Sequence, residues 1–430
     1  MHRELPMRGT MKQLLWCLTF LTVARLAAAD VEPGTEISKA NLDQVRDLVS
    51  PGVAWCVEHG MTMKIMAPKK VEWPSRYKAA TEAHSPQVRL SPDGNDLENY
   101  VAGLPFPNID VNDPNAATKI MWNYQYKPLI TDDVLMRDFQ VVSGPISFDK
   151  PMVIEREFTI GDLRRLYFNG RLYVEPKPEL PNPDRIRYKE LLSPVVEPFD
   201  MKGVGSLSIR YLSAAQQDDS FIYVPVLRRL RRQTTAQRSD SLFGQDTDQD
   251  SYWGFSGHIA WSDWKLLGVK DELGVLHREH FVPERCPRGA DFVYCDSWEK
   301  RRVYVIEGIS NLPQYAYGKR VLYIDTDAWV VLHSDIYDKG GQLWKVWLEF
   351  FSFRKQAPGS AITYEDEVGF TSAVMIDTQL DHATLIMIPG PHAPDQDTWF
   401  FNQGPNAKSP YAPGNLEEIF SVKHLIEAGH

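Results

Sequence analysis

The stretch KRVLYIDTDAWVVLHSDIYDKGGQLWKVWLEFFSF, residues 319–353, decides the fold. Its short runs of β-branched and aromatic residues are broken at residues 325–327 and 338–341, where Asp, Thr, Lys and Gly favour turns. The segment RRVYVIEGI, residues 301–309, precedes it, and TSAVMIDTQLDHATLIMI, residues 371–388, follows with the same texture. This pattern predicts a meander of β-hairpins.

The sequence pattern typical of β-strands extends over about residues 129–388. Further short runs bounded by Gly, Pro, Asp or Asn are REFTI (156–160), RLYFN (165–169), GSLSIRYL (205–212) and DSFIYVPVL (219–227). No long helical segment separates consecutive strands, which favours an antiparallel sheet over a parallel one. The predicted fold class is therefore α+β, mainly β, with one large antiparallel sheet.

Helices are expected near the two ends. EISKANLDQVRDLV, residues 36–49, has apolar residues at helical spacing and is expected to stop at Pro51-Gly52. A short helix is expected in DPNAATKIMWNYQY, residues 113–126, with Asp113 as its cap. The remaining proline-rich text up to residue 128 predicts an irregular wrap, and residues 414–430 predict a capped C-terminal helix.

The N-terminus has the order of a secretory signal peptide. Basic residues come first, an apolar stretch follows over residues 14–23, and Ala27-Ala28-Ala29 precedes Asp30. The expected organisation is a signal peptide at 1–29, a helix and proline-rich wrap at 30–128, and a β-rich domain with a C-terminal helix at 129–430. No second long apolar run follows, so no transmembrane span is expected after cleavage.

Charge and cysteine content narrow the class further. The net charge of -10 argues against a general nucleic-acid binder, because affinity for phosphate comes from cationic surface. In an exported chain a disulfide is permitted, and the short loop with Pro287 and Gly289 favours a bond between Cys286 and Cys295. Cys56, beside Trp55, is expected to be a buried free thiol.

The segment YVPVLRRLRR, residues 223–232, places arginines directly after a strand. Pro225 removes a backbone donor, which predicts an edge or bulged strand, and arginines there could simply deter sheet-to-sheet pairing. The acidic loop that follows suggests a second interpretation, in which the arginines hold that loop through ion pairs. The loop-anchoring residues would be Arg228, Arg229, Arg231, Arg232, Asp240 and Asp246.

This same region carries a family resemblance. Tyr223, Pro225, Arg229 and Arg231, followed by Asp240, Ser241, Gly244 and Asp246, resemble the strand and loop signature of the LolA/LolB-like superfamily of periplasmic lipid and lipoprotein carriers. The whole mature chain is similar to a larger Gram-negative envelope family within that superfamily, through RLSPDGNDLENYVAGLPFP, KRVLYID and YDKGGQLW. The resemblance implies a curved antiparallel sheet, an incomplete barrel, closed by helices and loops around an apolar cavity.

A ligand cavity would draw on the aromatic residues and arginines of the resembling region. The chain holds 12 Trp, 18 Tyr and 19 Phe, although aromatic residues at strand spacing more often form core. The candidate ligand-binding residues are Tyr211, Phe221, Tyr223, Pro225, Arg229, Arg231, Phe243, Trp253 and Phe255.

Catalytic and metal motifs are not evident. DTDQD, residues 246–250, imitates the start of an EF-hand loop but lacks the glycine and the glutamate that such a loop needs. His277 and His280 with Cys286 match no standard zinc spacing. The sequence contains no nucleophile elbow, phosphate-binding loop or HExxH motif. We expect neither an enzyme nor a cofactor.

The sequence therefore predicts an exported periplasmic protein, possibly associated with the outer membrane, that binds or passes on a hydrophobic or lipid ligand. An envelope exporter or outer-membrane protein would be its partner. One alternative is a non-catalytic scaffold whose cavity is filled by its own side chains. A second alternative is an extracytoplasmic hydrolase.

Overall fold

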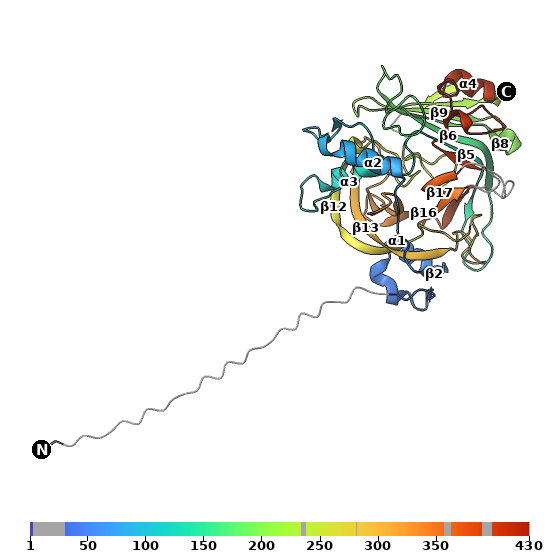
Figure 1. Ribbon diagram of the computed structural model, residues 1–430. Coiled ribbons are helices and arrows are strands. Elements are labelled where there is room, and N and C mark those ends of the chain that lie inside the picture. Colours follow the sequence, from blue (N-terminus) through green and yellow to red (C-terminus); the bar gives the residue numbers. More distant parts are fainter. Residues whose placement is uncertain (3–30, 234–237, 281, 357–362, 389–397, 430) are drawn as a thin grey trace.

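The computed structural model describes residues 1–2, 31–233, 238–280, 282–356, 363–388 and 398–429 (Figure 1). The predicted signal peptide, apart from its first two residues, lies outside the described residues. Within those residues no helix has the length and apolarity to cross a membrane.

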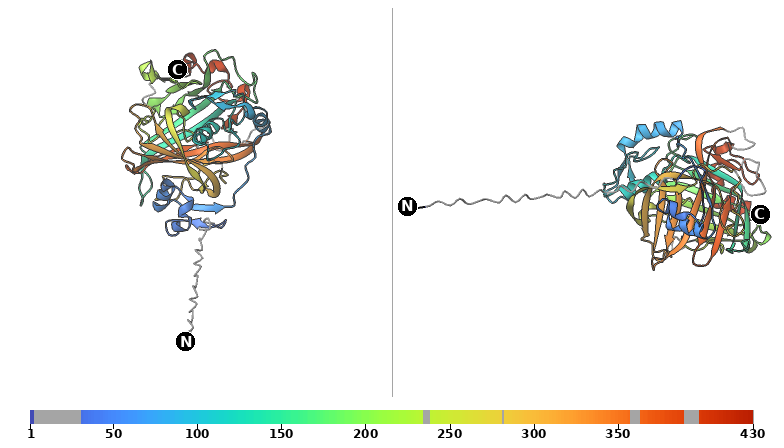
Figure 2. Two further views of the ribbon diagram at one scale, coloured as in Figure 1. Left: turned by 90° about the vertical axis from the view of Figure 1, so that its left-hand side faces the viewer. Right: turned by 90° about the horizontal axis from the view of Figure 1, so that it is seen from below.

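One large curved sheet forms the body of the molecule, and Figure 2 shows its strands bending around an interior. Neighbouring strands pair antiparallel in the following order: β11 (Arg229–Gln233), β10 (Asp219–Val224), β9 (Gly205–Tyr211), β7 (Ile186–Leu192), β6 (Arg156–Tyr167), β5 (Asp133–Pro145), β18 (His382–Met387), β17 (Thr363–Asp377), β16 (Leu343–Gln356), β15 (Val331–Tyr337), β14 (Lys319–Asp325), β13 (Ser297–Ser310) and β12 (Ser262–Gly274). The described residues of β11 and β12 form no pairing with each other, so the sheet stays open. The predicted antiparallel meander and the incomplete barrel are confirmed.

Short strands extend the sheet at its sides: β8 (Val195–Glu197) pairs with β6, β19 (Trp399–Phe401) with β5, and β2 (Met63–Met66) with both β13 and β1 (Glu36–Ile37). The β2–β13 pairing is parallel, which makes the sheet mixed. A separate hairpin joins β3 (Arg89–Leu90) to β4 (Leu97–Glu98). The N-terminal region therefore contributes strands to the main sheet as well as wrapping over it.

The helices are short and peripheral: α1 (Pro51–Glu58), α2 (Ser75–His84), α3 (Ala116–Gln125), α4 (Val422–Ala428), and the 3-10 helices η1 (Leu42–Leu48), η2 (Ser85–Gln87), η3 (Phe199–Met201), η4 (Pro225–Leu227), η6 (Ile259–Trp261), η7 (Gly404–Asn406) and η8 (Glu417–Ile419). Figure 1 places α4 beside β9, at the opposite end of the molecule from α1 and β2. Helix α4 is the predicted C-terminal helix, and the Ser421 side chain caps it by accepting from the His424 backbone N–H.

The helix predicted over residues 36–49 is wrong. That stretch forms β1 and the 3-10 helix η1, and Pro51 begins helix α1 instead of ending one. Proline suits the first turn because it has no N–H to satisfy, and the Ser50 side chain accepts from the Val53 backbone N–H. Gly52 is needed for close packing, since a Cβ there would lie 2.3 Å from Oδ1 of Asp335 on β15.

The second predicted helix is confirmed as α3, with a shifted start. It begins at Ala116 with Asn115 as its N-terminal flanking residue, and Asp113 instead accepts from the Asn115 backbone N–H and pairs with Lys119. Helix α2 lies in the stretch for which only irregular wrap was expected.

The buried core divides between the inside and the outside of the curved sheet. Inside, β5, β6 and β13–β19 contribute one cluster that includes Trp347 and Trp399. Outside, α1, η1 and β2 pack a second cluster against the sheet, with Val53 and Trp298 among its members. Cys286 of this second cluster forms a disulfide with Cys295, which packs against it, and Cys56 is a buried free thiol in the same cluster.

Candidate functional site

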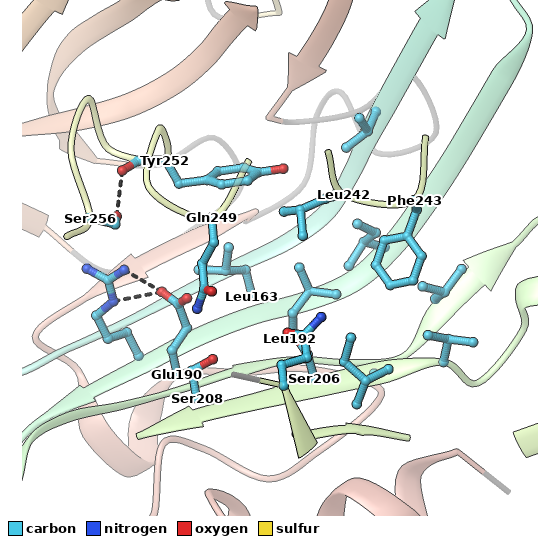
Figure 3. A pocket seen from close by; sticks show the side chains of 18 of the residues that line it. Leu163, Glu190, Leu192, Ser206, Ser208, Leu242, Phe243, Gln249, Tyr252 and Ser256 are labelled. Atoms are coloured by element: carbon cyan, nitrogen blue, oxygen red, sulfur yellow. Dashed lines mark hydrogen bonds and ion pairs between the residues drawn. The ribbon is translucent and has the colours of Figure 1, made fainter. Parts of the chain in front are cut away.

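A large apolar pocket lies between the open end of the sheet and the loop of residues 238–256 (Figure 3). It encloses about 1170 Å³ of space, its mouth included. Strands β6, β7, β9 and β10 form one wall, and the loop forms the opposite one. Apolar side chains dominate the lining, among them Ile160, Leu163, Leu192, Val204, Ile222 and Phe243.

The alternation of strand residues decides which side chains line the pocket. On β7, Tyr188, Glu190 and Leu192 face it, and on β9 Ser206, Ser208 and Arg210 do. The intervening residues point to the opposite face, because successive side chains of a strand project to opposite sides. That opposite face is covered by α4 and η8 in a separate apolar cluster.

The loop is fastened to the sheet by the buried side chain of Arg238. Its Nε lies 2.5 Å from Asp250 Oδ1, its Nη1 lies 2.8 Å from Asp218 Oδ2, and its Nη2 donates to the Ser256 carbonyl at 2.8 Å. Asp218 also pairs with Arg210 of β9, at 2.6 Å. Burial alone would lower the pKa of Arg238, but the two carboxylates hold it above its ordinary value.

Asp246, Asp248 and again Asp250 tie the loop to strand β18 and to the connection between β13 and β14. Asp246 accepts from Thr384 Oγ1 at 2.8 Å and pairs with His382, both on β18. Asp248 accepts from Tyr317 at 2.6 Å, and Asp250 accepts from Tyr315 at 2.8 Å. The hydrogen bond to Asp246 raises the pKa of His382. These bonds give the EF-hand-like stretch a structural role as an anchor.

One ion pair lies in the wall of the pocket itself. Arg165 of β6 donates from Nε to Oε2 of Glu190 on β7 at 2.7 Å, and its Nη2 lies 2.5 Å from the same oxygen. The guanidinium also lies 4.4 Å from the ring centre of Tyr188 and 5.0 Å from that of Trp253. Burial alone would lower the pKa of Arg165, but Glu190 holds it well above its ordinary value. The pocket therefore has a polar end and an apolar end.

Behind Arg165 lies a smaller cavity whose lining includes Lys127, Arg187 and Tyr124. Burial lowers the pKa of Lys127 to about 7 and raises the pKa of Glu349 to about 8. Burial thus favours the neutral form of each group, a deprotonated Lys127 and a protonated Glu349, which lessens the cost of placing them in the interior.

Of the candidate ligand-binding residues, Phe243 and Trp253 line the pocket. Tyr211, Phe221 and Tyr223 lie on the other face of β9 and β10, where they pack toward Leu425 of α4. The strands that carry these residues were predicted correctly, but the sequence pattern could not show which face of each strand lines the pocket.

The other candidates also lie away from this pocket. Phe255 packs edge-on against Trp264, with ring centres 5.0 Å apart, in the cluster under α3. Pro225 lies in the 3-10 turn η4 between β10 and β11, not within a strand as predicted. Arg229 and Arg231 are exposed on β11.

The arginines of residues 228–232 do not hold the acidic loop in this structure. Arg232 pairs with Asp219 of the adjacent strand, and Arg228 adopts a left-handed conformation at the hairpin turn with φ 47°. Asp240 is exposed, and Asp246 is bound by β18 as described above. The loop-anchoring hypothesis misplaced the cation: Arg238, inside the loop, takes that role. The available signal in the sequence was a single arginine, Arg238, within the same segment as the loop carboxylate Asp250.

The edge position of β11 agrees with the simpler interpretation of the arginines. Among the described residues β11 pairs only with β10, and Arg229–Arg232 are exposed along it. Charged side chains on an edge strand oppose pairing with another sheet.

A metal site is not evident in the part of the chain that the structure describes, since no group of three or more His, Cys, Asp or Glu side chains is placed to hold an ion there. His277 is instead hydrogen-bonded to Glu299, with 2.6 Å between Nδ1 and Oε1.

Fold and site together define a mainly β protein whose open, curved sheet holds a covered apolar pocket. Residues 36–417 match the family described as protein of unknown function, DUF1329, and the chain belongs to that family. No curated protein matches the chain.

Several solved structures are similar in architecture. A Vibrio parahaemolyticus domain described as an outer-membrane lipoprotein-sorting protein is 16% identical, with 72% of this chain and 97% of that chain covered and a TM-score of 0.46. A DUF1329 protein from Desulfovibrio piger is 13% identical, with 69% and 92% covered and a TM-score of 0.42. A LolA superfamily protein from Nitrosomonas europaea is 12% identical, with 72% and 98% covered and a TM-score of 0.37. Such distant likeness says nothing about function.

Proposed function

We propose that this protein binds a hydrophobic or lipid ligand in the pocket beneath the loop of residues 238–256, and passes it on within the cell envelope. The pocket carries the proposal. It is a concave, mostly apolar space between the strands and the loop, with a few polar groups at one end, as small-molecule sites commonly are.

The lining supports a ligand that is mostly apolar. Leu163, Leu192, Val204 and Ile222 present aliphatic surface from the sheet, and Phe243 faces them from the loop. Apolar surface around open space is unfavourable in water, and an apolar ligand would remove it from solvent. A scaffold with a self-filled cavity would show side chains packed into this volume.

The covering loop supports a bound ligand that is shielded from water. Arg238 at the start of the loop pairs with Asp218 beside β10, and Asp246 near its middle bonds to β18, so the roof is held in place before a ligand arrives. A preformed site binds more tightly because less chain is ordered on binding.

The location and the partner rest on the sequence. The signal peptide predicted at residues 1–29 supports a location in the periplasm. In that compartment the protein would pass its ligand to an exporter or to an outer-membrane protein. We infer no catalytic role, because the pocket offers an apolar surface instead of a reactive pair.

Binding of the neutral fluorescent amine N-phenyl-1-naphthylamine tests the proposal. Ser206 points into the pocket, so Ser206→Trp would fill it and should weaken probe binding about tenfold or more. Gln216→Trp, on an exposed loop, adds the same side chain outside the pocket and should leave binding unchanged.

Extraction of the purified protein with organic solvent gives a second measurement, and a co-purifying lipid is the expected result. Absence of probe binding by the wild-type protein, or equal binding by Ser206→Trp, would favour the scaffold instead.

A further inference from the structure

The polar end of the pocket contains a carboxylate oxygen to which no described residue donates a hydrogen bond. Both described contacts of Arg165 with Glu190 go to the Oε2 atom. The other oxygen, Oε1, receives no hydrogen bond from any residue that the structure describes, and the Glu190 side chain is 27% exposed in the pocket wall. Figure 3 shows two dashed lines reaching one oxygen of the Glu190 carboxylate.

Two uncharged polar side chains lie on either side of Glu190, while the remaining charged residues of the lining, Arg210, Asp218 and Arg238, are paired with one another. Ser208 lies on the neighbouring strand and shares a hydrogen bond of 3.2 Å with Ser220. Gln249 hangs from the loop and points toward the wall that carries Glu190, and its side-chain amide has no hydrogen bond to any described residue (Figure 3). An acceptor and an amide thus remain available to a ligand at one end of the pocket.

We propose that the pocket selects a neutral amphiphile with a hydroxyl group at its polar end, and that Glu190 Oε1 accepts the hydrogen bond from that hydroxyl. This inference rests on the proposed function of the same pocket. The aliphatic portion of the ligand lies toward Leu192, Val204 and Phe243.

Charge excludes the ionised alternatives. A ligand carboxylate at this end would lie beside the Glu190 carboxylate. The arginines that the structure describes in the lining are already paired, Arg165 with Glu190 and Arg210 and Arg238 with Asp218. A ligand ammonium would meet an ion pair whose net charge is zero, so its own charge would be buried without a counter-ion. A hydroxyl donates one proton to the free oxygen and carries no charge to desolvate.

Chain-matched ligands test this directly. At pH 8, 1-hexadecanol should displace N-phenyl-1-naphthylamine from the wild-type protein at a concentration roughly tenfold or more below that needed for hexadecanoate or hexadecylammonium, because a hydrogen bond to a charged group contributes about that factor. Equal or better displacement by either ionised ligand would overturn the inference.

A variant pair locates the effect. Glu190→Gln removes the negative charge and frees Arg165, so hexadecanoate should become the better competitor. Glu197→Gln removes the same charge from the exposed last residue of β8, which does not line the pocket, and should keep the wild-type preference. A preference that survives Glu190→Gln refutes the role of Glu190, and the wild-type comparison decides the ligand class even if that variant does not fold.

The two proposals fail in different ways. If the probe does not bind the wild-type protein at all, the pocket is not a binding site and the proposed function falls. If the probe binds but the three competitors displace it equally, binding stands and only the selection of a hydroxyl falls.

Discussion

Arg238 should be the residue on which the covering loop depends. Arg238→Met keeps the apolar stem of the side chain and removes the guanidinium, which the structure places within 2.8 Å of both Asp218 and Asp250. Asp218 would keep Arg210, whereas Asp250 would lose its paired guanidinium and keep the Tyr315 hydroxyl as a donor, with Arg320 acting on it only through a longer-range attraction. Removing one partner of a buried ion pair costs about 3–5 kcal/mol, because the other charge stays in the interior.

The matched control is Arg232→Met. Arg232 pairs with Asp219, but its side chain is 69% exposed, and an ion pair in water contributes about 0–1 kcal/mol. The two variants lose the same charge from positions close in sequence. The difference between their unfolding free energies should therefore measure how much more a buried ion pair contributes than an exposed one.

Equilibrium unfolding in urea provides the free energies, and hydrogen exchange of the backbone amides of residues 239–256 reports the loop itself. We expect Arg238→Met to lower the unfolding free energy by about 3 kcal/mol or more and to speed exchange in the loop. A loss within about 1 kcal/mol of that of Arg232→Met, with exchange unchanged, would refute the reasoning.

Three other predictions concern the pH response, the disulfide and export. Burial raises the pKa of Glu272 from 4.5 to about 7, so its ionised form is penalised only in the folded protein. As pH rises, the unfolded chain loses this proton before the folded protein does, so the free energy of unfolding falls between about pH 4.5 and about pH 7. The stabilisation by Glu272→Gln relative to the wild-type protein should therefore grow over that range, by up to about 3 kcal/mol. Paired urea titrations in which this difference does not depend on pH would contradict the prediction. Reduction of the Cys286–Cys295 disulfide should cost about 2–3 kcal/mol, which thermal unfolding with and without reductant would show, whereas unchanged unfolding would argue against it. N-terminal sequencing of the periplasmic protein should begin at Asp30, and recovery of only the full-length chain in the cytoplasm would oppose export.

The strands of the meander could be predicted because their signal is local. In residues 319–353 the runs of β-branched and aromatic residues and the turns between them specify strand, turn, strand without reference to the rest of the chain. Helix α3 was predictable for the same reason. The helix expected at residues 36–49 failed because its apolar spacing also suits a 3-10 turn held against the sheet, and tertiary packing decided between the two.

The pocket was only partly predictable. Phe243 and Trp253 were identified, whereas the ion pair of Arg165 with Glu190 joins strands β6 and β7 and left no mark in the sequence. The loop anchor Arg238 was missed because the more conspicuous arginines at 228–232 lie on an exposed edge strand.

The amino-acid sequence by itself determined the strand pattern, the antiparallel order of the meander and the cysteine pair favoured for a disulfide, since each depends on neighbours along the chain. Only the tertiary structure decided which face of β7, β9 and β10 lines the pocket and which lies under α4. A strand alternates its side chains with a period of two whichever way it is turned, so the same pattern fits either orientation. The choice between them depends on what packs on each face, and those partners come from distant segments: residues 238–256 on one side and residues 417–428 on the other.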